Sequence, residues 1–205
     1  MATFRRCARC GGTGGVLPDP VGALVAVVGP SGAGKDTLIR LAQQHFRDDP
    51  RVSFPRRVVT RPSGADEDHD SLSTNGFADA RAAGAFALDW DAHGLSYGIP
   101  MAVLAAVRDG DVAVVNLSRG ALPAARERFP AVVAVYVTAP AEVLAARLAA
   151  RGRAESVLDR LARASVASPD AGRDIVIENV GTAEAAAARL IAVIAARLGM
   201  DSVTA

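Results

Sequence analysis

The chain has 205 residues, of which 50% are hydrophobic and 22% are charged, and its formal net charge at pH 7 is +1. A chain of this length can bury one sizeable core, which favours a single domain, and its charge lacks the basic excess of a nucleic-acid binder. No apolar run approaches the ~18 residues that a membrane span needs, and no secretory signal is visible. We therefore expect a cytoplasmic protein that has neither nucleic acid nor membrane as a partner.

The first twenty residues are expected to form a flexible leader before a folded domain over residues 21–200. Cys7 and Cys10 make a Cys-x-x-Cys pair in this leader, which resembles half of a zinc site. Structural zinc takes four ligands, and the chain has 2 cysteines in all. Zinc would therefore have to be shared between two chains, and the leader interpretation is simpler.

A glycine-rich turn follows the first apolar run. Residues 24–28 are apolar and rich in β-branched side chains, which predicts a strand buried on both faces, and residues 37–44 have helical spacing. Between them the glycine and lysine spacing is that of a phosphate-binding loop. Glycines let the backbone fold around a phosphate with its N–H groups inward, while Lys35 and the helix N-terminus attract the anion. The expected ATP-binding residues are Gly29, Pro30, Ser31, Gly32, Ala33, Gly34, Lys35, Asp36 and Thr37.

The residue after the loop lysine departs from the usual pattern. That position is normally Ser or Thr, whose hydroxyl binds Mg²⁺, but here it is Asp36. A carboxylate is an oxygen ligand for Mg²⁺, directly or through water, and Thr37 offers a hydroxyl one position later. Asp36 is the candidate metal ligand, and Thr37 is the alternative.

Short elements are expected after the first helix. Pro55 divides residues 51–60 into two brief apolar stretches, which predicts brief or edge strands. The following segments predict a polar loop, a short amphipathic helix broken at Gly84, and a strand with a tight turn, over residues 63–70, 77–87 and 89–98. This region looks like an insertion over the carboxyl edge of a sheet, where ligands bind in such folds.

The rest of the chain alternates apolar strands with helices. The expected strands cover residues 112–116, 132–138 and 174–178. The expected helices cover residues 100–108, 121–129, 140–151, 155–166 and 183–198, the last with Thr182 as its N-cap. This alternation predicts an α/β fold, with a parallel sheet covered by helices on both faces.

An arginine array accompanies the phosphate loop. Arg147 and Arg151 are four residues apart and project from one helix face, and Arg153 follows in the loop beyond. A transferring phosphoryl group spreads negative charge over its oxygens, which guanidinium groups meet with paired hydrogen bonds. The array therefore predicts phosphoryl transfer; the alternative is a solvated face of an arginine-rich protein.

A second basic group precedes the polar loop and consists of Arg56, Arg57 and Arg61. A kinase needs a second phosphate site for its acceptor, and this group is the natural candidate. The alternative is an exposed edge strand that charge protects from pairing.

These motifs together resemble the guanylate kinase family over residues 23–198. The resemblance rests on the phosphate loop, Val-Val-Thr60-Arg61-Pro62, Tyr97-Gly98 and Arg147-Leu-x-x-Arg151-Gly. It implies a three-layer phosphate-loop kinase fold with a five-stranded parallel sheet, an acceptor-binding arm over residues 54–98 and a lid over residues 147–160. It also implies that Thr60 and Arg61 contact the acceptor phosphate, that Arg147 and Arg151 belong to the lid, and that Asn179 lies near adenine.

Several positions depart from a guanylate kinase. Val59 stands where that family has a second Thr, Asn116 replaces the acidic residue that ends the third strand, and residues 67–70 do not match its guanine pocket. A guanine-binding site without those hydrogen-bonding groups would discriminate guanine poorly from other bases.

The departures are similar to a narrower family, the ribose 1,5-bisphosphate phosphokinases of phosphonate utilisation. The shared motifs are Gly-Pro-Ser-Gly-x-Gly-Lys-Asp36, Arg56-Arg-Val-Val-Thr-Arg-Pro62, Trp90-x-Ala-His93-Gly-Leu-x-Tyr97-Gly98 and Val115-Asn116-x-Ser118-Arg119. This resemblance implies transfer of the γ-phosphoryl of ATP, with Mg²⁺, to the phosphate on C1 of the sugar, giving 5-phosphoribosyl 1-diphosphate and ADP.

The resulting hypothesis assigns each residue a role. Lys35, Arg147 and Arg151 are the catalytic residues, and Arg147 and Asn179 join the loop in binding ATP. The sugar phosphate is bound by Arg57, Thr60, Arg61, Tyr97, Asn116, Ser118 and Arg119, while His93 is as easily structural. The enzyme is expected to be a monomer or homodimer. The alternatives are a nucleoside monophosphate kinase and a non-catalytic guanylate-kinase-like binding module, although such modules tend to lose the phosphate loop.

Overall fold

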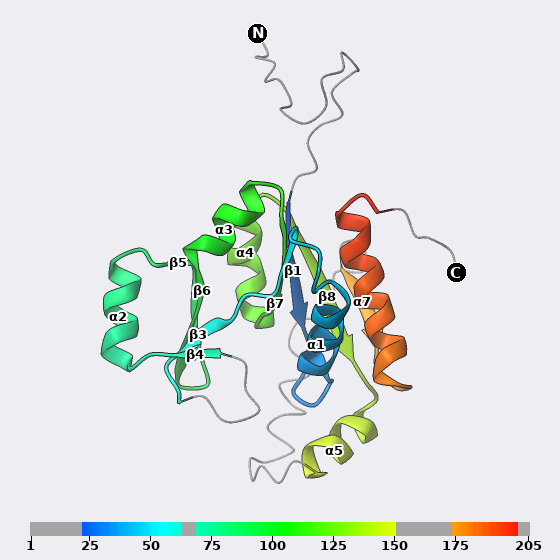
Figure 1. Ribbon diagram of the computed structural model, residues 1–205. Coiled ribbons are helices and arrows are strands. Elements are labelled where there is room, and N and C mark those ends of the chain that lie inside the picture. Colours follow the sequence, from blue (N-terminus) through cyan, green and yellow to red (C-terminus); the bar gives the residue numbers. More distant parts are fainter. Residues whose placement is uncertain (1–21, 63–68, 151–173, 201–205) are drawn as a thin grey trace, which may run out of the picture.

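The computed structural model describes residues 22–62, 69–150 and 174–200 (Figure 1). Several expectations lie outside these residues. They are the leader with Cys7 and Cys10, most of the polar loop over residues 63–70, the helix over residues 155–166, and the arginines Arg151 and Arg153.

The core is a five-stranded sheet in the order β2-β7-β1-β8-β9, and every neighbouring pair is parallel. Its strands are β1 (Ala23–Val28), β2 (Val52–Ser53), β7 (Val112–Asn116), β8 (Val132–Thr138) and β9 (Ile175–Glu178). All six residues of the central strand β1 are buried, as expected where helices cover both faces of a sheet. The predicted five-stranded parallel sheet is confirmed, and the stretch before Pro55 forms a two-residue edge strand.

Helices cover both faces of this sheet. On one face lie α1 (Lys35–His45) and α7 (Ala183–Arg197), whose buried side chains pack with Val25 and Val27. On the other lie α3 (Met101–Arg108) and α4 (Leu122–Arg128), which pack with Leu24 and Ala26. Successive residues of β1 therefore point to opposite faces of the sheet and pack into the two hydrophobic cores on either side of it. The predicted three-layer α/β architecture is confirmed.

A second sheet of four strands stands beside the core, in the order β4-β3-β6-β5 (Figure 1). Its strands are β3 (Arg57–Val59), β4 (His69–Ser71), β5 (Phe86–Ala92) and β6 (Leu95–Pro100). Strand β6 runs directly into α3, while α2 (Thr74–Ala82) packs on β5 through a stacked pair of rings, Phe77 and Phe86. Leu88 and Ile99 reach into the α3 and α4 core, which fixes this sheet against the central one.

Two predictions in this region were wrong in their bounds. The helix expected over residues 77–87 is α2, which begins earlier because the Ser73 side chain accepts a hydrogen bond from Gly76 N at 3.1 Å. It ends before Gly84, whose φ of 71° interrupts the helix, and Phe86 begins β5 instead. The polar loop was expected to reach residue 70, but His69 and Asp70 belong to β4, and His69 is only 2% exposed.

Helix ends elsewhere agree with the expectations to within a few residues. Thr182 caps α7, since its hydroxyl accepts a hydrogen bond from Ala185 N at 3.2 Å. The helix expected from residue 121 is preceded by a short 3₁₀ turn, η1 (Arg119–Ala121), and α5 (Ala141–Ala150) follows β8. The tight turn after β5 is a two-residue hairpin loop in which His93 and Gly94 both have positive φ, 56° and 72°, as in a type I′ turn.

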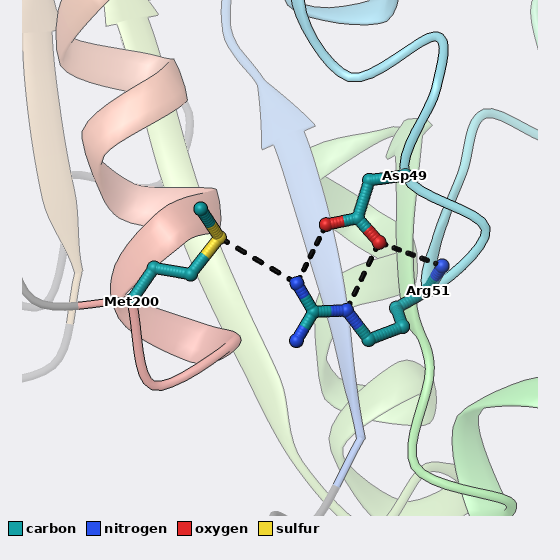
Figure 2. A network of polar contacts seen from close by, with 3 residues as sticks. All are labelled: Asp49, Arg51 and Met200. Atoms are coloured by element: carbon teal, nitrogen blue, oxygen red, sulfur yellow. Dashed lines mark hydrogen bonds and ion pairs between the residues drawn. The ribbon is translucent and has the colours of Figure 1, made fainter.

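The turn between α1 and β2 is tied to the end of α7 (Figure 2). Arg51 donates from Nε to Asp49 Oδ1 at 2.9 Å and from Nη2 to Asp49 Oδ2 at 2.7 Å. The same Nη2 lies 3.7 Å from the sulfur of Met200, which follows α7. The first and last helices of the described chain are thus linked next to the edge strand.

Candidate active site

The strand register gathers the predicted site residues at one edge of the core sheet. Val27 lies opposite Asn116, and Val28 lies opposite Tyr136, so β7 and β8 end on either side of the exit of β1. Because all five strands are parallel, the loops after β1, β7, β8 and β9 share this edge. In Figure 1 it is the lower edge, between the second sheet on the left and α5 on the right.

Each of three glycines in the phosphate loop is required for its own structural reason. Gly29 has φ 145°, and a Cβ there would collide with the carbonyl oxygen of Val137 on β8. Gly34 has φ 92° at the N-terminus of α1, and a Cβ would lie 2.5 Å from the Asn179 side-chain nitrogen. Gly32 also has a positive φ, 84°, which side chains with a Cβ rarely adopt. The loop is therefore a tight cradle held against β8.

Lys35 lies across the beginning of this loop. Its Nζ donates to the carbonyl oxygens of Gly29 and Pro30, each at 2.9 Å, and the loop is closed by a bond from Ala33 N to Pro30 O at 3.3 Å. These bonds hold the ammonium group at the loop, where an outer phosphate of a bound nucleotide would need a positive charge.

Asn179 joins the loop to the neighbouring elements. It is 4% exposed, and its Nδ2 donates to the carbonyl oxygen of Ala33 at 2.8 Å. Its backbone N donates to Thr138 O at 2.7 Å, and its carbonyl oxygen accepts a bond from Arg147 Nη2 at 3.1 Å. The phosphate loop, the end of β8 and helix α5 therefore meet at this one buried residue.

Arg147 is brought to the phosphate loop by this contact. Its Nη1 is buried and has no hydrogen-bond partner among the residues that the structure describes. A buried guanidinium nitrogen without an acceptor is unfavourable, and the position suits the oxygen of a bound nucleotide. The assignment of Arg147 to a lid stays a prediction.

Asp36 and Asn116 face each other at the same edge. Asp36 is exposed in the first turn of α1, and Asn116 is the partly exposed last residue of β7. The Asn116 side-chain nitrogen donates to Asp36 Oδ1 at 2.6 Å, a short bond of the charge-assisted kind. In the sequence the two residues are separate departures from the usual patterns, and their complementary chemistry is the signal that could have paired them.

An aromatic and cationic cluster lies on the second sheet. Trp90 and Tyr97 are opposite each other on β5 and β6, with ring centroids 5.3 Å apart and planes within 8°. The guanidinium carbon of Arg57 is 5.8 Å from the Tyr97 ring centroid, within cation–π range. Two predicted substrate residues, Arg57 and Tyr97, are thus brought together, and Trp90, which shares their cluster, was not among the predicted site residues.

Thr60 is placed by the same hairpin. Its N donates to Ser96 O at 3.1 Å, and its hydroxyl oxygen accepts a bond from Ser96 N at 2.8 Å. The side chain of Ser96 in turn donates to Asp91 at 2.6 Å. That bond, followed by the nearby Arg81, holds the pKa of Asp91 below its usual range, so the end of the hairpin carries a negative charge at neutral pH.

His69 is a buried residue that sequence reasoning missed. Its Nε2 lies 3.2 Å from the carbonyl oxygen of Arg61, and Arg56 binds the same strand, donating to His69 O at 2.8 Å and pairing with Asp70 at 3.2 Å. Arg56 thus holds β4 to the segment before β3. Nothing in the sequence distinguished this histidine from the polar residues around it.

The other residues that the sequence singled out come shortly after strand ends, Ser118 and Arg119 after β7 and His93 after β5. Ser118 and Arg119 begin the 3₁₀ turn after β7. His93 is exposed at the hairpin turn, where its positive φ reflects a turn position. Within the described ranges, no three His, Cys, Asp or Glu residues cluster as a metal site, and no helix there is long and apolar enough to cross a membrane.

The parallel core sheet, its covering helices and the loop after β1 define a fold of the guanylate kinase class. The solved structure of guanylate kinase from Anaplasma phagocytophilum matches with a TM-score of 0.65, covering 89% of this chain and 88% of that one. The sequences are only 19% identical, so this likeness shows the fold alone.

Curated relatives define the family more narrowly. The chain is 52% identical over 173 residues to the ribose 1,5-bisphosphate phosphokinase of Methylobacterium radiotolerans, which covers 83% of this chain and 96% of the relative. It is 49% identical over 175 residues to the enzyme of the same name from Rhodopseudomonas palustris, covering 84% and 88%. No protein-family model matches the chain. The chain belongs to the ribose 1,5-bisphosphate phosphokinase family, which confirms the narrower resemblance and makes it an ATP-using kinase.

Proposed function

We propose that this enzyme transfers the γ-phosphoryl group of ATP to the phosphate on C1 of ribose 1,5-bisphosphate. An oxygen of that phosphate forms a bond to the γ-phosphorus, and the bond from the γ-phosphorus to the β–γ bridging oxygen breaks. The electron pair leaves with ADP, and the sugar product is 5-phosphoribosyl 1-diphosphate. We place this step in phosphonate utilisation and in the cytoplasm.

The donor site is proposed to be the loop from Gly29 to Thr37. Its backbone N–H groups and the N-terminus of α1 would surround the β- and γ-phosphates. Lys35 is held against the loop by two 2.9 Å bonds and would neutralise the charge that develops on the transferring group. Arg147 would add its buried Nη1, with Arg151 following in a lid over residues 147–160.

The same edge offers oxygen ligands that fit Mg²⁺, a hard cation that prefers carboxylate and carbonyl oxygens. Asp36 is the proposed ligand, and its exposed carboxylate lies in the first turn of α1. Bound there with ATP, Mg²⁺ would supply positive charge to the β- and γ-phosphate oxygens.

The acceptor site is proposed to lie on the arm, residues 54–98, facing the carboxyl edge. Arg57, Thr60, Arg61 and Tyr97 would bind the acceptor phosphate. Asn116, Ser118 and Arg119 would contact the sugar or its phosphates from the core side. The second ionisation of a phosphate has a pKa near 6, so the acceptor is already a dianion at neutral pH and needs little help from a general base. The task of these cations is to offset the repulsion between two anions.

Family membership carries the assignment of the acceptor, and an acceptor panel tests it. Purified enzyme with MgATP would be offered ribose 1,5-bisphosphate, ribose 5-phosphate, GMP and AMP, and ADP release would be measured with a coupled assay. We expect turnover with ribose 1,5-bisphosphate well above that with the others. Robust turnover of GMP without any with the bisphosphate would make the enzyme a nucleoside monophosphate kinase. No turnover of any acceptor, together with a failure to bind ATP in calorimetry, would favour a non-catalytic binding module.

A further inference from the structure

We propose that Asp36 and Asn116 act as one magnesium-holding pair. The carboxylate follows the loop lysine and the uncharged polar side chain ends the strand, which is the reverse of the usual arrangement. The inference rests on the proposed use of MgATP, and it is independent of which acceptor is phosphorylated. In phosphate-loop enzymes the metal is normally held by a Ser or Thr hydroxyl after the loop lysine and by an Asp from a strand of the sheet. Here the carboxylate follows the lysine, and an uncharged amide ends the strand.

The backbone brings the two positions together. Asn116 is opposite Val27 on β1, and the pairing continues beyond it with a bond from Leu117 N to Val27 O at 3.0 Å. The end of β7 therefore stands beside the exit of β1, from which the loop leads to Asp36. The 2.6 Å bond between the side chains closes this arrangement.

The pair keeps one carboxylate in total. Two carboxylates at this separation would repel each other, and an amide with a hydroxyl would leave the metal without a negatively charged protein ligand. The unusual Asp36 and the unusual Asn116 therefore compensate each other. Either substitution alone would change the charge of the site, whereas together they preserve it.

The direction of the bond separates the roles of the two residues. Asn116 donates from Nδ2 to one carboxylate oxygen, Asp36 Oδ1. Asn116 does not donate to the other carboxylate oxygen, Asp36 Oδ2. We assign Oδ2 to the metal. Toward the metal, Asn116 is then a positioning residue that acts through Asp36, as ligand-orienting groups do in other metal sites, in addition to the acceptor contact proposed for it above.

A charge-exchange series tests this assignment in the full-length enzyme without any acceptor. The variants are Asp36→Ser, Asn116→Leu, and the double exchange Asp36→Ser/Asn116→Asp, which restores the usual arrangement. Asp36→Ser/Ser118→Asp is the matched control, because it has the same net charge as the exchange and places the carboxylate two residues further along the same edge. Thr37→Val tests the alternative hydroxyl ligand.

Two binding measurements are made on each variant. Calorimetry gives the dissociation constant of a non-hydrolysable ATP analogue with Mg²⁺ and with EDTA. The electron paramagnetic resonance signal of free Mn²⁺ gives the affinity of the metal for the enzyme–analogue complex. Thermal unfolding of the ligand-free variants checks that each is folded.

We expect Asn116→Leu to weaken metal binding in the complex by about tenfold, within the range found when metal ligands lose their orienting partners. Asp36→Ser removes the assigned ligand itself and should weaken metal binding by at least as much. The double exchange should recover most of the loss, and the matched control should not. Equal recovery by the matched control would overturn the inference. So would full metal affinity in Asp36→Ser, with or without a loss in Thr37→Val.

The failure of the inference and that of the proposed function are distinguishable. A wild-type enzyme that does not bind the nucleotide overturns both. A wild-type enzyme that binds it normally, with no recovery in the double exchange, overturns the inference alone. A wrong acceptor changes neither binding measurement.

Discussion

Lys35 places a positive charge at the phosphate loop through local contacts. It is partly buried, and its ammonium group binds two carbonyl oxygens of its own loop. Those bonds hold the charge beside the position proposed for the outer phosphates. We therefore expect Lys35 to contribute charge to the reaction and little to the core, whose two clusters do not include it.

The first prediction concerns this charge. Lys35→Ala should lower kcat by at least about 100-fold, the loss typical for one electrostatic donor at a reacting group. Circular dichroism should show an unchanged fold. Arg40→Ala, on the exposed side of the same helix, is the control and should keep normal activity. Near-normal turnover by Lys35→Ala would remove the lysine from the mechanism.

Asn179 and His69 mark how far sequence reasoning reaches at this scale. The family resemblance placed Asn179 near adenine, and the structure adds a contact that no motif encodes, since its amide holds the carbonyl of Ala33. His69 lay in a stretch of polar residues without any periodicity, so its burial under Arg61 depends on a tertiary contact. Single side chains that bridge distant segments cannot be recognised from local patterns.

At the scale of the element, the β5–β6 hairpin supports the proposed acceptor site. Its two strands present Trp90 and Tyr97 as directly opposed residues, and Arg57 joins them from β3. Stacking of this kind contributes about 0.5–1.5 kcal/mol beyond the buried area. Trp90 thereby fixes the ring on which Arg57 lies.

The second prediction follows from that stack. Trp90→Ala should raise KM for the acceptor by about 2- to 10-fold, the equivalent of the stacking energy, and should leave KM for ATP unchanged. Trp90→Phe retains an aromatic face and should stay near the wild type. An equal rise in both KM values would mean that Trp90 supports the whole fold and not the acceptor site.

The third prediction concerns the turn between α1 and β2. The hydrogen bonds from Arg51, foremost its side chain, hold the pKa of Asp49 below its ordinary range. A carboxyl group whose pKa is lowered in the folded state stabilises the fold at pH values above its ordinary pKa, about 3.9. That stabilisation is lost as the pH falls through the lowered pKa.

Asp49→Asn should therefore lower Tm at pH 7 by a small amount, because an exposed ion pair contributes at most about 1 kcal/mol. Thermal unfolding across pH 7 to 3 should show this difference shrinking as the pH falls below about 4. Asp48→Asn, whose carboxylate is largely exposed, is the control. A difference that stays constant with pH would show that the charge of Asp49 is not its cause.

Helices and strands with a clear hydrophobic pattern were predictable from the sequence, whereas strands that exist because they pair with a neighbouring strand were not. The runs that form β7 and β8 were predicted at their observed bounds, since buried parallel strands are continuously apolar. Strand β4 has only three residues and the sequence His-Asp-Ser, so its strand character comes from its pairing with β3. The start of α2 was missed because Ser73 was not recognised as an N-cap, which moved the expected helix toward β5.

The whole molecule is an arrangement of two sheets around one edge. The core sheet supplies the phosphate loop and the neighbouring strand ends, and the second sheet supplies the aromatic and cationic cluster. The general α/β architecture followed from the alternation of strands and helices, whereas the family resemblance was needed to expect the arm. The proposed acceptor site depends on contacts between these parts, which composition and spacing do not encode.

The central claim is that two phosphates are held end to end while one phosphoryl group moves to the C1 phosphate of the sugar. The ³¹P NMR spectrum of the product formed from ribose 1,5-bisphosphate and MgATP tests it most directly. We predict two coupled signals from a diphosphate on C1, together with an unchanged monoester on C5 and the signals of ADP. A diphosphate on C5, or an unchanged bisphosphate in a sample where GMP is phosphorylated, would contradict the account.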